Sequence, residues 1–114
     1  MSFIKGGKMV SFEQFKEMDI RIGEVLEVED VAGADKLYIL TVDIGDETRK
    51  MIAGIKPWYT REDLVGKTVV VLANLEPKVI RGFESNGMVL ATLSEGKLAV
   101  LTTDRETKPG SKVS

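Results

Sequence analysis

The clearest pattern in this chain is a two-residue alternation of apolar and polar side chains between residues 19 and 30. One parity carries Ile20, Ile22, Leu26 and Val28, and the other carries Arg21, Gly23, Glu27 and Glu29. Glu24 and Val25 are the exceptions. Because successive side chains of a strand point to opposite faces, the pattern predicts a half-buried β-strand. Gly23 in its middle favours a sharp bend or a close backbone approach.

Shorter apolar runs predict the remaining elements. The continuous Val/Leu run at residues 67–74 predicts a central strand, because a strand buried on both faces has no polar face to alternate with. The other predicted elements are strands at 37–44 and 47–55, a capped helical turn at 60–66, a hairpin of 88–93 with 98–103, and a polar tail at 104–114.

The N-terminal residues predict an arm followed by a short helix. Residues 1–8 contain Gly6 and Gly7 and indicate a flexible arm. Ser11 is a good N-cap, and Gln14 three residues later completes a capping box. Phe12 and Phe15 would then lie on one side of the helix, where they would pack on the body of the protein or on a second copy.

The order of these elements predicts the fold. Three strands, a helical turn and further strands are typical of an oligonucleotide-binding (OB) barrel. We therefore predict an all-β protein, namely an OB-fold five-stranded barrel with a short helix between strands 3 and 4 and a C-terminal β extension. The predicted regions are an arm and helix at 1–18, the OB-fold domain at 19–91, and an extension at 92–114 that we expect to dimerise.

The composition removes most catalytic chemistry. The 114 residues are 43% hydrophobic, enough for one domain with a core, and include no Cys and no His. Disulfides, thiolate metal sites and Ser-His or Cys-His pairs are therefore excluded. No segment of the sequence approaches the roughly 20 apolar residues of a membrane helix. We expect a soluble, cytoplasmic, non-enzymatic protein without a cofactor.

Charge is segregated along the chain although the formal net charge is only −2. Residues 13–30 hold seven acidic and two basic residues, whereas residues 49–81 hold seven basic and three acidic residues. Such segregation produces local potentials that the net charge conceals. A solvated surface without function is the alternative interpretation.

Residues 73–91 form the stretch that carries the most candidate binding chemistry. Polar donors and the turn formers Pro77, Gly82 and Gly87 lie here between two apolar runs. Pro and Gly predict irregular backbone between strands. Because loops held by a rigid scaffold usually carry function, we predict a binding site here.

Five blocks of sequence, in order, resemble the tRNA-binding domain family. They are Asp19-Ile20-Arg21-Ile22-Gly23, Ala34-Asp35-Lys36-Leu37, Gly54-Ile55-Lys56-Pro57, Val71-Leu72-Ala73-Asn74-Leu75, and Arg81-Gly82 with Ser85-Asn86-Gly87-Met88. The resemblance implies an OB fold that binds tRNA by shape, usually as a homodimer. It also implies a free-standing protein or an accessory, β-type subunit of methionyl-tRNA synthetase, whose catalytic chain would be a partner.

The predicted tRNA-binding residues follow from the two loops that grip ligand in OB barrels. Cations contribute phosphate contacts, and polar groups near Gly87 could bond an unstacked nucleotide or a 2′-hydroxyl. The predicted set is Lys36, Arg49, Lys50, Lys56, Asn74, Lys78, Arg81, Ser85, Asn86 and Met88. Two positions depart from the family pattern: Asn86 replaces a frequent glutamate, and Val79 replaces a frequent basic residue.

Several alternatives stay open. Met88 either packs on a base or fills the core, and Trp58 and Tyr59 either stack bases or cover a barrel end or a dimer seam. Asp35 is expected to orient its own loop or Lys36 rather than to touch ligand.

A chaperone of the CsaA type, which binds extended peptides in a comparable groove, is the competing function. Outward-facing Leu37, Ile39 and Met51 would suit it. A small enzyme would need paired carboxylates, for which only Glu24 and Asp43 are remotely placed.

Overall fold

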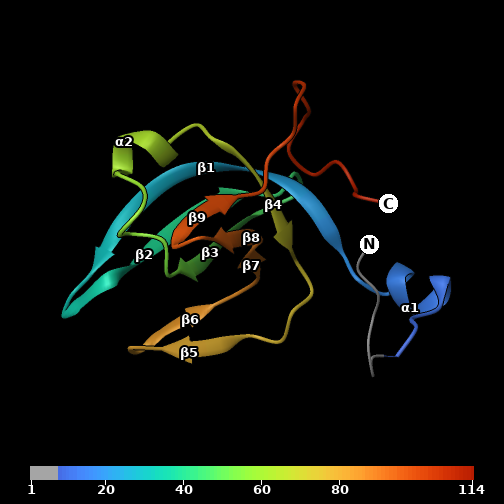
Figure 1. Cartoon of the computed structure of the whole chain (residues 1–114), viewed down its shortest axis with the longest axis horizontal. Helices are drawn as coiled ribbons and strands as arrows, with labels where there is room; N and C mark the ends of the chain where they lie inside the picture. Colours follow the sequence, from blue (N-terminus) through green and yellow to red (C-terminus); the bar gives the residue numbers. More distant parts are fainter. Residues whose placement is uncertain (1–7) are drawn as a thin grey trace.

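A long bent strand, β1 (Ile20–Val31), organises the molecule and pairs with two neighbours along its length (Figure 1). Gly23 allows a close approach of the neighbouring strand, because a side chain there would start 2.6 Å from Cγ1 of Val42. A β-bulge between Val25 and Glu27 then changes the phase of the alternation. Val25 is consequently fully buried and Leu26 is 40% exposed, so their predicted sides were wrong.

The computed structural model describes residues 8–114, so the predicted arm lies almost wholly outside the described residues. The all-β prediction is confirmed. The main sheet is antiparallel with the order β3-β2-β1-β4-β7, and its other strands are β2 (Ala34–Asp43), β3 (Thr48–Ala53), β4 (Thr68–Leu72) and β7 (Met88–Val89). Two further hairpins are β5 (Lys78–Ile80) with β6 (Phe83–Ser85), and β8 (Ala91–Ser94) with β9 (Lys97–Val100). The end strand β3 also contacts β6 and β7.

The two helices are short and begin where the sequence predicts. In α1 (Phe12–Lys16), Ser11 and Gln14 form the expected capping box. In α2 (Arg61–Leu64), which lies between β3 and β4 as predicted, Thr60 and Asp63 form another. Neither helix has the length and apolar character needed to cross a membrane, and residues 8–114 contain no other helix.

The core lies on the inner face of the main sheet. Its fully buried side chains are Val25, Leu40, Val42, Ile44, Met51, Leu64, Val69 and Val71. The central position of β4, between β1 and β7, agrees with its continuous apolar run. Ile39 and Met51 are both buried rather than outward-facing. Met51 belongs to the main core, and Ile39 packs with Val31 and Ala34 in a second small cluster.

The turn between β1 and β2 is tighter than predicted. The strands pair up to Val31 and Ala34, so only two residues separate them, and Gly33 adopts a positive φ of 75°. Asp35 and Lys36 are therefore strand residues and not loop residues. A single turn with Gly in the left-handed region suffices to reverse the chain here.

Residues 73–91 are also more regular than the sequence indicated. The β5–β6 hairpin occupies the middle of the stretch and projects from the sheet at the bottom of Figure 1. Its two turn residues, Arg81 and Gly82, both have positive φ, as a type I′ hairpin requires. Pro77 precedes the hairpin and does not interrupt it.

The C-terminal residues predicted as a tail run along β1. Ile22 donates its backbone N–H to Ser111, and Val113 donates to Ile20. The β8–β9 hairpin is held by two aromatic side chains: the Trp58 indole donates to the Gly96 carbonyl, and Val100 donates to the Tyr59 hydroxyl. Tyr59 packs against the core, whereas Trp58 remains 41% exposed, so both predicted roles stay open for Trp58.

Candidate nucleic-acid interface

Lys36 and Arg81, two of the predicted tRNA-binding cations, lie on the same surface. Lys36 is exposed on β2, and Arg81 is exposed at the turn of the β5–β6 hairpin. Together with residues 33–35 and Leu37 they line one hollow of about 410 Å³. The tips of the β1–β2 and β5–β6 hairpins lie at the same side of the molecule, at the left of Figure 1.

Lys56 and Lys50 extend this surface, but carboxylates of β1 neutralise both. The Lys56 backbone N–H donates to the Lys36 carbonyl at 3.3 Å, which joins the two positions. The Lys56 ammonium lies 2.9 Å from Asp30, and Lys50 lies 3.6 Å from Glu29. The hydrogen bond from Lys56 holds the pKa of Asp30 below its usual range.

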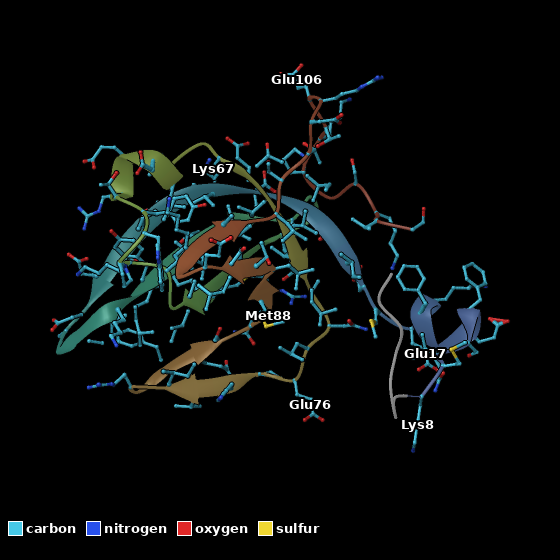
Figure 2. All side chains as sticks on the ribbon, in the orientation of Figure 1. Lys8, Glu17, Lys67, Glu76, Met88 and Glu106 are labelled. Carbon is cyan, nitrogen blue, oxygen red and sulfur yellow. The ribbon has the colours of Figure 1, made fainter. Side chains whose placement is uncertain are left out.

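A second hollow, of about 240 Å³, lies between the β5–β6 hairpin and the main sheet. Its walls include Lys78 and the apolar side chains of Ile52, Leu75, Ile80 and Met88. Figure 2 shows Met88 at the junction between β7 and the hairpin. Met88 is 42% exposed and therefore does not fill the core, so its predicted contact with a ligand stays open.

Ser85 and Asn86 hold the hairpin to β3. Ser85 is buried, and its Oγ accepts the Ile52 backbone N–H at 2.9 Å. The Asn86 backbone donates to the Lys50 carbonyl at 2.9 Å, while its side chain reaches Glu84 at 3.5 Å. The Asn86 amide is therefore the more available of the two for a ligand.

Arg49 and Asn74 are engaged within the protein. The Arg49 guanidinium donates to the Ala73 carbonyl and to the Glu47 carboxylate. The hydrogen bond to Glu47 raises the pKa of Arg49. The Asn74 side chain accepts from the Asp19 backbone and donates to the Glu17 carbonyl, which fixes the chain between α1 and β1. Both have a structural role, and we leave them out of the proposed contact surface.

Sequence reasoning missed a third hollow, of about 480 Å³, beside α2. Its walls include Asp30, Lys56, Trp58 and Arg61. Asp30 pairs with Arg61 at 3.3 Å as well as with Lys56. The only local signal was the aromatic pair after Lys56-Pro57, because the approach of Arg61 depends on tertiary structure.

Fold and surface together define a small all-β binding domain whose strands and hairpins present clustered cations beside partly apolar hollows. More specifically, the chain belongs to the family described as "Putative tRNA binding domain", whose profile matches residues 20–112.

Its relatives include much longer proteins. The chain is 45% identical over 111 residues to the methionine-tRNA ligase of Thermococcus onnurineus. The matched region covers 96% of the chain and 15% of that protein. It is 51% identical over 104 residues to the methionine-tRNA ligase of Pyrococcus furiosus, covering 91% of the chain and 14% of that protein. The chain thus spans about one seventh of the length of these relatives.

Solved structures of similar size match almost end to end. A MetRS-related protein from Pyrococcus horikoshii superposes with a TM-score of 0.87 at 30% identity, covering 94% of this chain and 99% of that one. The chaperone CsaA from Bacillus anthracis superposes with a TM-score of 0.84 at 32% identity, covering 94% and 100%.

Proposed function

We propose that this chain binds tRNA through its phosphate backbone and shape, without strong sequence specificity. The observation that carries the proposal is the approach of Lys36 and Arg81, two cations from distant sequence blocks, on one surface. Cations that converge on a surface bind phosphates by releasing condensed counterions, which confers affinity without base recognition. Membership of the tRNA-binding family supports the same conclusion.

The contact surface consists of Lys36, Lys50, Lys56, Lys78 and Arg81, with Asn86 and Met88 beside them. We infer that the main sheet closes through β3, β6 and β7 into an OB barrel, in which ligand lies across β2 and β3. The Asn86–Lys50 backbone bond and the contacts of β3 with β6 and β7 support this closure. The β5–β6 hairpin then forms one wall of the groove.

The chain would act in the cytoplasm without catalysing a reaction itself. It would work as a free-standing protein or as an accessory subunit of a methionyl-tRNA synthetase, increasing that enzyme's hold on tRNA. Similarity to part of two methionine-tRNA ligases supports the second role.

A homodimer would widen the surface offered to tRNA. The β8–β9 hairpin carries Leu93, which is 63% exposed, and Leu101 follows it at 40%. Exposed apolar side chains on a hairpin suit an isologous contact between two copies.

Binding of extended peptides is the second candidate, supported by the likeness to chaperone CsaA and by exposed apolar residues on the hairpin. Val79 is 69% exposed, and Phe83 is also exposed. These side chains give a peptide an apolar surface beside the cations.

Filter binding of bulk tRNA and of double-stranded DNA, at low and at moderate salt, tests the proposal. We expect tRNA to bind more tightly than DNA and to weaken steeply with salt. An unfolded peptide tested in parallel should bind weakly. Salt-insensitive peptide binding without tRNA binding would favour the chaperone function instead.

A further inference from the structure

The hollow beside α2 contains a fixed pair of cations that share one exposed carboxylate. Lys56 Nζ lies 2.9 Å from Oδ1 of Asp30, and Arg61 Nη2 lies 3.3 Å from Oδ2. The two cations come from different segments, one before and one within α2. Each oxygen of a single anion is thus matched by one cation, which is the arrangement that the two free oxygens of a phosphodiester would need.

Trp58 provides an aromatic surface in the same hollow. It is 41% exposed, although its indole N–H is fixed by a 3.0 Å hydrogen bond to the Gly96 carbonyl. A ring that is held in place and open to solvent can stack on a base at little entropic cost. Lys56 reaches the same space and also lies 5.7 Å from the centre of the Tyr38 ring.

One backbone hydrogen bond connects the hollow beside α2 to the proposed tRNA surface. The Lys56 backbone is bonded to Lys36, and Lys36 shares its own hollow with Arg81. Cations therefore follow one another from the tip of the β5–β6 hairpin to α2.

We propose that this hollow is a subsite for one unpaired nucleotide of RNA, whose phosphate replaces Asp30 between Lys56 and Arg61 while its base stacks on Trp58. This subsite rests on the proposed function, since tRNA supplies the nucleotide. Asp30 is exposed and can swing towards solvent when the phosphate enters. In the free protein it keeps the two cations in position.

Trp58 is the only tryptophan in the sequence, so its fluorescence reports on this hollow alone. The test measures acrylamide quenching of the full chain with and without saturating tRNA, while a mobility-shift assay records binding separately. We expect tRNA to reduce the quenching constant by about twofold or more. Polyphosphate, which has charge but no base, should bind without this protection.

Arg61→Gln should weaken tRNA binding by about three- to tenfold, as expected for one lost phosphate contact, and reduce the protection of Trp58. The matched control Arg105→Gln alters an exposed arginine beside Glu106, at the far tip of the C-terminal segment in Figure 2, and should behave as wild type. Thermal melts would verify that both variants fold.

The outcomes separate the subsite from the proposed function. Binding of tRNA with unchanged acrylamide access to Trp58, or with equal protection by polyphosphate, would overturn the subsite and leave tRNA binding intact. Equal effects of Arg61→Gln and Arg105→Gln would also overturn it. A complete lack of tRNA binding would overturn both proposals.

Discussion

A methyl group placed on Gly33 would lie 3.8 Å from Nη1 of Arg81, although these residues belong to hairpins that are far apart in the sequence. Both have positive φ, and each lies in the turn of a two-stranded hairpin. The turn geometry therefore brings the Arg81 guanidinium against the β1–β2 turn. Lys36, three residues after Gly33, lines the same hollow.

Asp30→Asn should raise the affinity for tRNA. The carboxylate competes with phosphate for Lys56 and Arg61, and its removal frees both cations. Because exposed ion pairs each contribute little free energy, we expect the affinity for tRNA to rise about two- to fivefold. Filter binding measures it, with Asp104→Asn as a control on the C-terminal segment. A loss of affinity would show that Asp30 contributes to tRNA binding directly.

Ser85→Ala should destabilise the fold more than it affects the salt dependence of tRNA binding. The substitution removes the buried Ser85 hydroxyl and leaves the partly buried Ile52 backbone N–H without its 2.9 Å partner. An unsatisfied buried donor costs about 1–3 kcal/mol of unfolding free energy. Urea titration measures the loss. Unchanged stability with a large loss of affinity would instead make Ser85 a direct ligand contact.

Leu93→Glu should dissociate the homodimer that we propose. Burying an unpaired carboxylate in an apolar seam would raise the dimer dissociation constant about tenfold or more. Light scattering at micromolar concentration measures the mass, and Val65→Glu, at an exposed site just after α2, is the control. A wild-type monomer at this concentration would contradict the proposed dimer.

Stability should fall at acidic pH through Asp19. Hydrogen bonds from Arg21 lower the pKa of Asp19, with a further contribution from Lys112. A depressed pKa stabilises the fold above the unfolded value of about 3.9, and this stabilisation is lost as pH falls through the folded value.

Asp19→Asn should therefore cost about 1 kcal/mol at neutral pH, and its stability should depend less on pH below about 4. Thermal melts between about pH 2 and 7 compare the variant with wild type. Parallel curves for the two proteins would contradict the role assigned to the Asp19–Arg21 pair.

Local signals in the sequence predicted local structure well. The capping boxes at Ser11 and Thr60 depend on residues three positions apart, so their helices begin where expected. The bulge after Val25 depends on pairing across strands, which no local pattern records. The β5–β6 hairpin was missed because Arg81 rather than Asn or Asp precedes Gly82 in its turn.

The sequence predicted some residues of the candidate site, whereas other features of the site depend on the tertiary structure. The sequence blocks identified Lys36 and Arg81, which the fold brings together. The sequence could not show that Arg49 donates to the Ala73 carbonyl, or that Arg61 and Lys56 both pair with Asp30. These contacts join residues that are distant in the sequence, and they decide which cations are available to a ligand.

The most direct test of the cationic surface is the slope of log affinity for tRNA against log salt, measured for the wild type, Lys36→Ala, Arg81→Ala and the double variant. Each single variant should flatten the slope by roughly one unit, and the double variant by about two, equally for all tRNA species. An unchanged slope in the double variant, or a change in which tRNA is preferred, would contradict the account.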